Sequence, residues 1–271
     1  SISKGNSDVI MLANIDTKQH TINLVSVYRD SYLDTGSGTY QKCNAAYAKG
    51  GPEQALSMLN TNLDLAITDY VTVDFNAIIE CVDLLGGVDI TITDDEASLM
   101  IGYMKELNEL TGHNSTPPAS GGTYTLDGVQ ACAYARIRYG GGDDYRRTER
   151  QRTVLTAMMQ KAQKSNILTL NKLINAAFGD IQTSFSNTDL LALATKVFSY
   201  DIGDTTGFPY EKTTHKYDKI GDVVIPCDLA SNVTQLHQFL FNDENYTPSA
   251  TVLSNSQQII SNTGYKQGDG H

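Results

Sequence analysis

Arginine is concentrated in one short segment of this chain. Six of its seven arginines lie in residues 134–152, whose sequence is YARIRYGGGDDYRRTERQR. The planar guanidinium fork matches the oxygens of phosphate and carboxylate groups, so such a cluster is typical of an anion-binding site. Because the whole chain has a formal net charge of −11, the cluster indicates a local anion pocket on an acidic protein. The six arginines are Arg136, Arg138, Arg146, Arg147, Arg150 and Arg152.

The spacing inside this segment indicates the size of the anion. If the residues after the glycines are helical, Arg147, Arg150 and Gln151 share one face, because they stand at i, i+3 and i+4. The three glycines 140–142 would let backbone amides approach a ligand closely. The two arginines before the glycines share a side if their segment is extended and do not if it is helical. So many donors exceed what one carboxylate needs, and we infer a pyrophosphate ligand.

Two other interpretations of the segment stay open. It could be a solvated helical face whose arginines pair with Asp143, Asp144 and Glu149. Nucleic-acid binding is disfavoured, because only Tyr139 and Tyr145 could stack on bases and the net charge is negative.

A second pair of charged residues follows a predicted strand. Residues 8–15 and 22–28 are apolar, β-branched runs separated by a polar turn, which predicts an antiparallel hairpin. Arg29 and Asp30 come directly after the second strand, and ligands of α/β sheets are usually met just past strand ends. A surface ion pair at a strand end is the alternative.

The order of the remaining elements predicts the fold class. Strand patterns at 69–75 and 88–93 alternate with helical patterns at 76–85 and 94–112, and a helix break is expected at Gly50-Gly51-Pro52. We therefore expect an α/β protein, a three-layer α/β/α arrangement with a central mixed sheet flanked by helices. Residues 1–271 are expected to form one domain, with its motifs in 7–160 and a helical and mixed C-terminal part in 161–271.

The histidines, the apolar runs and the cysteines disfavour several classes of catalytic site, membrane span and metal site. The five histidines are scattered and form no catalytic triad or HExxH motif, and the apolar runs are shorter than the about 18 residues that a membrane span needs. The cysteines lack CxxC spacing and nearby histidines, which disfavours a zinc site; two disulfides remain open, and buried core thiols are the alternative for Cys81 and Cys132. The four cysteines are Cys43, Cys81, Cys132 and Cys227.

Several motifs in a fixed order resemble one family. The segments SDVIML (7–12), SVYRDSYL (26–33) and KCNAAYAKGGPE (42–53) are followed by VDFNAIIECVDLLGGVDI (73–90), LDGVQACAYARIR (126–138) and DYRRTERQ (144–151). This series resembles the LytR-CpsA-Psr family of cell-wall glycopolymer ligases. The resemblance covers about the first 160 residues.

What the resemblance implies is a Mg²⁺-dependent phosphotransferase, with Mn²⁺ as a substitute ion. It would move a phosphoglycan, such as a teichoic acid or capsular polysaccharide, from a polyprenyl-pyrophosphate carrier to a peptidoglycan hydroxyl. Asp8 matches a magnesium ligand, and Asp30 would help position the metal or the arginines. We assign the pyrophosphate to Arg29, Arg136, Arg138, Arg147, Arg150 and Gln151; these residues apart from Arg150, together with Asp30, are the expected catalytic set.

The resemblance also implies where the protein acts. At some positions the sequence departs from the family pattern. Such enzymes are membrane-anchored at the extracellular face of Gram-positive-type cells, so an anchor and a second magnesium aspartate are expected upstream of Ser1. Tyr28 replaces the usual proline before the arginine, and Asn6 stands where arginine is frequent. The rival functions are a non-catalytic lipid-pyrophosphate binding protein or sensor, a lipid pyrophosphatase, and a structural wall protein.

Overall fold

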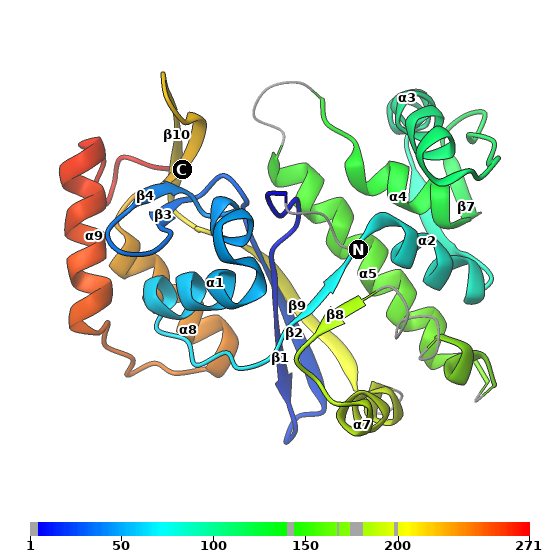
Figure 1. Cartoon of the computed structure of the whole chain (residues 1–271), viewed down its shortest axis with the longest axis horizontal. Helices are drawn as coiled ribbons and strands as arrows, with labels where there is room; N and C mark the ends of the chain where they lie inside the picture. The colour runs from blue at the N-terminus through cyan, green and yellow to red at the C-terminus, as the bar shows by residue number, and fades with distance from the viewer. Residues whose placement is uncertain (1–4, 140–143, 167, 174–180, 198–199) are drawn as a thin grey trace. The chain divides into compact units, whose positions relative to one another are not determined.

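The computed structural model describes residues 5–139, 144–166, 168–173, 181–197 and 200–271 (Figure 1). These residues form two compact units. The first unit contains residues 17–21 and 71–202, and the second contains residues 5–16, 22–70 and 203–271, within the described ranges. The expectation of a single domain stays a prediction.

The second unit contains most of the strands. Its strands are β1 (Met11–Asp16), β2 (Thr21–Val27), β3 (Tyr32–Asp34), β4 (Tyr40–Lys42), β9 (Asp201–Phe208), β10 (Lys212–Tyr217) and β11 (Gly221–Pro226). Its helices are α1 (Ala45–Leu63), α8 (Leu229–Phe241) and α9 (Ala250–Thr263). Figure 1 shows α9, in red, running past β3 and β4.

Strand pairing in this unit includes antiparallel and parallel contacts, as expected for the predicted mixed sheet. β1, β2 and β9 form a three-stranded sheet, and β10 pairs with β11 in antiparallel register. Just beyond β2, Ser31 forms a parallel bridge to Val224 of β11. The predicted hairpin of β1 and β2 and the α/β class are therefore confirmed.

The core of the second unit accounts for the apolar residues of β2. Val25 and Val27 are buried with Leu33, Phe208 and Ile225, and helices α1, α8 and α9 add buried side chains to the same cluster. The predicted break lies inside α1, where Gly50 and Gly51 leave helical geometry and Gly51 has φ 66°. Proline is tolerated there because it begins the second helical segment.

The first unit contains most of the helices. They are α2 (Phe75–Leu84), α3 (Asp94–Thr111), α4 (Gly128–Arg136), α5 (Asp144–Gln163) and α7 (Asn187–Val197). Its strands are β5 (Val71–Val73), β6 (Val88–Ile92), β7 (Gly122–Leu126) and β8 (Ile181–Thr183). The pairs β5–β8 and β6–β7 are antiparallel. β5 is shorter than the predicted strand 69–75, because only three residues pair with β8.

Alternation and helical periodicity build the core of this unit. Val88, Ile90 and Ile92 of β6 point inward while the residues between them are exposed. Met100 and Met104 of α3 are fully buried in the same cluster. Part of the C-terminal region 161–271, which was predicted to be helical and mixed, lies outside the described residues.

The structure shows the state of the cysteines and whether any described helix could span a membrane. All four cysteines are free thiols. Cys132 is buried, which fits the core-thiol alternative, whereas Cys81 is only half-buried; Cys43 and Cys227 are buried as well. Among the described residues, none of the helices combines the length and apolar character of a membrane span.

Close contact at Gly128 sets the position of α4. Its backbone N donates to Asp83 Oδ1 at 2.7 Å, and Asp127 and Gln130 form a reciprocal capping box at this helix start. A Cβ at Gly128 would stand 2.3 Å from the backbone oxygen of Ile79 in α2. Only glycine therefore lets α4 pack this closely on α2.

Replacing Gly128 with alanine should destabilise the protein by about 3 kcal/mol, because the new methyl group meets backbone that cannot yield locally. Gly102→Ala is the matched control, since a Cβ there contacts nothing within 4 Å and the position is helical. The control should be stabilising by about 0.5–1 kcal/mol. Urea unfolding followed by circular dichroism measures both; an unchanged midpoint for Gly128→Ala would contradict the packing argument.

Candidate functional site

Arg136 is the last residue of α4 and lies against aromatic rings. Its guanidinium stands 4.9 Å from the ring centroid of Phe75 and 5.6 Å from that of Tyr103. Its Nη2 donates to Glu106 Oε1 at 3.0 Å, whereas the buried Nη1 has no hydrogen-bond partner among the described residues. The rings fix the plane of the guanidinium, and an unsatisfied buried donor is a suitable contact for a ligand oxygen.

The end of α4 separates Arg136 from Arg138. Ile137 is fully buried and has φ −52° and ψ 134°, so the chain becomes extended immediately after Arg136. The segment is therefore neither wholly helical nor wholly extended, which resolves the question that the sequence left open. Arg138 is half-buried. The predicted glycine cradle, residues 140–142, and Asp143 lie outside the described residues.

The predicted helical face of α5 is present. Arg147 and Arg150 are each 5% exposed, and Gln151 is half-buried with no hydrogen-bond partner for its buried Oε1 in the described part of the chain. Guanidinium groups are rarely withdrawn from water to this extent without specific partners. Of the other two arginines of α5, Arg146 is exposed and Arg152 is half-buried.

Arg150 is held by groups from two other elements. Its Nε donates to Glu96 Oε1 at 2.8 Å, and its Nη1 donates to the carbonyl of Ile137 at 3.2 Å. Its guanidinium also lies 5.0 Å from the ring centroid of Tyr139. These contacts give Arg150 a positioning role at the junction of α3, α4 and α5; its predicted contact with pyrophosphate stays a prediction.

In the second unit, oppositely charged side chains alternate just past the end of β2. Arg29 pairs with Asp8 through Nη1, and its Nε lies 3.7 Å from Asp30 Oδ2. Lys42 Nζ lies 3.1 Å from Asp30 Oδ1. The structure thus brings Asp8, Arg29 and Asp30 together.

Lys42 is the member that sequence reasoning missed. It stands at the start of the KCNAAY segment, whose resemblance to the family assigns no role to this lysine. The only signal in the sequence is that Lys42 directly precedes Cys43 and Asn44 in this segment. The pairing itself depends on β4 reaching the end of β2.

Backbone hydrogen bonds from the next segment hold this turn in place. Cys43 N donates to the Ser31 carbonyl at 2.8 Å, and Asn44 N donates to the Arg29 carbonyl at 3.1 Å. Burial, reinforced by the nearby charge of Asp30, raises the pKa of the Cys43 thiol to about 12. The thiol is therefore protonated at neutral pH, and its Sγ lies 3.3 Å from the carbonyls of Tyr28 and Arg29. A structural rather than a nucleophilic role follows.

The donor set of the second unit is compatible with Mg²⁺. The ion prefers hard oxygen ligands and is commonly held by one or two carboxylates together with waters and substrate phosphates. Asp8 offers a carboxylate with a 60% exposed side chain, and Asp30 is mostly buried beside it. Within the ranges described, acidic and other ligating side chains form no group of three or more that could enclose a metal ion. An ion here would therefore rely on other oxygens to complete its coordination.

The predicted site residues divide between the units. The first unit contains Arg136, Arg138, Arg147, Arg150 and Gln151, and the second contains Asp8, Arg29 and Asp30. Lys42, which was not predicted, also lies in the second unit. Within each unit, contacts with neighbouring groups hold these side chains in defined positions, as a site that binds an anion or a metal ion requires.

Comparison with known proteins identifies the family. The LytR_cpsA_psr family model matches residues 2–218. The polyisoprenyl-teichoic acid–peptidoglycan teichoic acid transferase TagV of Bacillus subtilis (strain 168) is 29% identical over 202 residues, covering 70% of this chain and 48% of TagV. The transferase TagU of Enterococcus faecalis (strain ATCC 700802 / V583), named for the same activity, is 30% identical over 196 residues, covering 71% of this chain and 59% of TagU. The chain thus spans about half the length of these relatives.

A solved structure shares the fold. Bacillus subtilis TagT with bound octaprenyl pyrophosphate lipid superposes with a TM-score of 0.64 at 23% identity, covering 88% of this chain and 86% of that one. Since the family model spans most of the sequence and the arginine and RDSY motifs fall inside the matched range, the chain belongs to the LytR_cpsA_psr family.

Proposed function

We propose that this chain is the catalytic part of a phosphotransferase. It moves a glycopolymer phosphate from a polyprenyl-pyrophosphate carrier to a hydroxyl of peptidoglycan. The observation that carries the proposal is the burial of Arg147 and Arg150, together with the half-buried Arg136, in one unit of an acidic protein. The relatives' names and the lipid in TagT support the same chemistry.

The reaction suits arginine and amide side chains. In phosphoryl transfer the protein must neutralise charge on the phosphate oxygens and align the attacking and leaving oxygens, with little covalent work of its own. In the first unit, Arg136 and Arg147 bind phosphate oxygens, and Arg138 and Gln151 add further donors. Arg150 keeps the junction in shape through Glu96.

The residues proposed for the cation lie in the second unit. Asp8 is the exposed carboxylate that would hold Mg²⁺, with Asp30 in support, while Arg29 binds a phosphate oxygen. When bound, the ion would lower the charge of the pyrophosphate and stabilise the departing phosphate. Lys42 and Arg29 both contact Asp30 and so keep its carboxylate in one orientation.

The location follows from the same proposal. The enzyme acts at the outer face of the cell membrane of a Gram-positive-type bacterium, where lipid-linked polymer and peptidoglycan meet. The organisms of the relatives support this placement.

The decisive experiment reconstitutes purified protein with lipid-linked polymer, Mg²⁺ and peptidoglycan acceptor. Formation of polymer-linked peptidoglycan with release of polyprenyl phosphate is the expected result. Lipid retained without turnover would instead indicate a binding protein or sensor, and phosphate release without acceptor would indicate a pyrophosphatase. Mass spectrometry of lipids extracted from the purified protein identifies the carrier.

Arg147→Ala should lower transfer by about 10³-fold, the size expected when a guanidinium that stabilises phosphoryl charge is removed. Arg146→Ala is the matched control, because the neighbouring side chain is exposed and its loss should change the rate by less than about twofold. Initial rates and the unfolding midpoint are measured for both variants. Equal rates for Arg147→Ala and the wild type would remove Arg147 from the site.

Asp8→Asn should weaken binding of the metal by about tenfold or more, because the amide loses the negative charge that attracts the ion. Mn²⁺ as a paramagnetic probe reports this directly through the free and bound signals in electron paramagnetic resonance, without any turnover. Asp243→Asn, an exposed carboxylate in the same unit, is the control. If both variants bind Mn²⁺ as the wild type does, Asp8 is not a ligand.

A further inference from the structure

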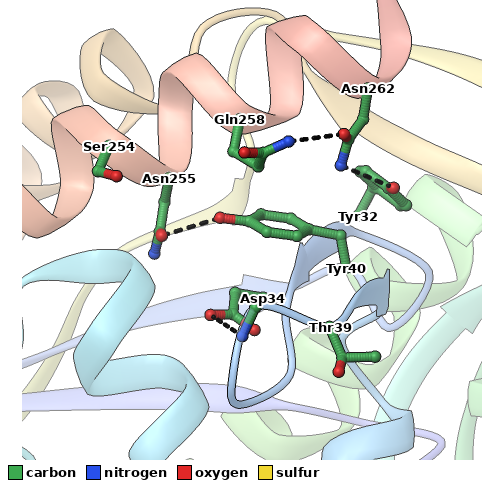
Figure 2. Close-up of a pocket in the computed structure, with 9 residues that line it drawn as sticks. Tyr32, Asp34, Thr39, Tyr40, Ser254, Asn255, Gln258 and Asn262 are labelled. Atoms are coloured by element: carbon green, nitrogen blue, oxygen red, sulfur yellow. Dashed lines mark hydrogen bonds between the residues drawn. The ribbon is translucent and has the colours of Figure 1, made fainter.

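An open, polar pocket of about 690 Å³ lies between the β3–β4 pair and α9 in the second unit (Figure 2). Its volume falls within the roughly 300–1,000 Å³ of typical small-molecule sites. None of its residues belongs to the sets assigned above to pyrophosphate or metal. The lining consists of Tyr32, Asp34, Gly38, Thr39, Tyr40, Ser254, Asn255, Gln258 and Asn262.

A row of amide side chains on α9 forms one wall. Asn255, Gln258 and Asn262 stand at i, i+3 and i+7, so they share a face of the helix. The adjoining face carries Val252 and Ile259, which are fully buried in the core and fix the rotation of the helix. Gln258 Nε2 donates to Asn262 Oδ1 at 2.8 Å, and both side chains line the pocket (Figure 2).

Tyrosine rings form the opposite side. The rings of Tyr32 and Tyr40 have centroids 6.0 Å apart, and Figure 2 shows Tyr40 reaching across toward α9. Tyr40 Oη donates to Asn255 Oδ1 at 2.9 Å, and Asn262 Nδ2 donates to Tyr32 Oη at 3.3 Å. Burial, followed by the nearby charge of Asp34, raises the pKa of Tyr40 to about 12, so the hydroxyl keeps its proton as a donor.

Buried hydrogen bonds hold the floor in one arrangement. Asn62 is fully buried, and its Nδ2 donates to the Asp34 carbonyl at 2.8 Å. Asn255 is 7% exposed and reaches Asn62 Oδ1 at 3.4 Å. The shape of the pocket is thus fixed by side chains that packing has already ordered, which reduces the entropy lost on binding.

The charge of the lining disfavours phosphate. All nine lining residues lie in the described part of the chain, and they include no lysine, arginine or histidine. The one ionisable acid, Asp34, is 9% exposed, and its oxygens accept from Gly36 N at 2.9 Å and Gly38 N at 3.2 Å. A phosphate would meet a carboxylate with no cation to offset it.

We infer that this pocket binds an uncharged saccharide unit. Each amide offers an acceptor and two donors, which match adjacent hydroxyl or N-acetyl groups, and tyrosine rings offer apolar faces to the C–H side of a sugar ring. The lining residues by themselves support saccharide binding. Its place in the reaction, as a subsite for sugars of the donor polymer or of the peptidoglycan acceptor, rests on the proposed function.

The test measures equilibrium binding of saccharides to the whole chain in the absence of lipid, with NMR or calorimetry as the readout. A tetramer of N-acetylglucosamine stands for an amino-sugar glycan of the peptidoglycan type, and maltotetraose stands for a neutral wall polysaccharide. A glycerol phosphate oligomer is the charged comparison. Gln258→Ala and Asn262→Ala remove exposed amides, and Gln257→Ala is the matched control, since this neighbouring exposed amide does not line the pocket.

Saturable binding of one neutral tetramer, weakened by about tenfold in Gln258→Ala and Asn262→Ala and unchanged in Gln257→Ala, is the expected result. The tetramer that binds more tightly identifies the source of the sugar. Absence of saturable binding up to about 10 mM, equal weakening by Gln257→Ala, or preference for the glycerol phosphate oligomer would overturn the inference. Transfer lost in Arg147→Ala with saccharide binding intact distinguishes this site from the proposed reaction.

Discussion

A buried ion pair between Glu96 and Arg150 holds together the part of the first unit that carries the arginines. Glu96 Oε1 accepts from Arg150 Nε, while Glu96 Oε2 accepts from Thr93 N at 3.0 Å and so also caps α3. The other end of Arg150 holds the carbonyl of Ile137, where α4 stops. Removing either partner of a buried pair typically costs about 3–5 kcal/mol, because a charge is left without compensation. The pair therefore fixes one arrangement of three helices.

That arrangement explains how positive charges can be gathered in an acidic protein. Arg136 rests on aromatic faces, and Arg147 is withdrawn into the helix junction, so neither relies on bulk water alone. Like charges held close together repel more strongly as water is excluded. A doubly charged anion would relieve this repulsion, which is the physical link between the packing of α4 and α5 and the proposed pyrophosphate.

The second unit uses a different principle for its charges. Asp8, Arg29, Asp30 and Lys42 alternate in sign, so each charge is compensated locally. The turn that carries them is fixed by β2, which is buried on both faces, and by backbone bonds from Cys43 and Asn44. The polar pocket on α9 belongs to the same unit but lacks cations, which suits it to sugars rather than to phosphate.

The sequence by itself determined the α/β class, the β1–β2 hairpin, the break at Gly50 and Gly51, and the family, because periodicity, glycine conformation and motif order are local properties. It also identified the arginine cluster and the pair past β2. Only the tertiary structure decided what each charged side chain contacts. Glu96 is 54 positions from Arg150, and Glu106 is 30 positions from Arg136. Such partners are brought together by packing between elements, which no local pattern specifies; the same is true of the pocket, whose two walls are more than 200 residues apart in sequence.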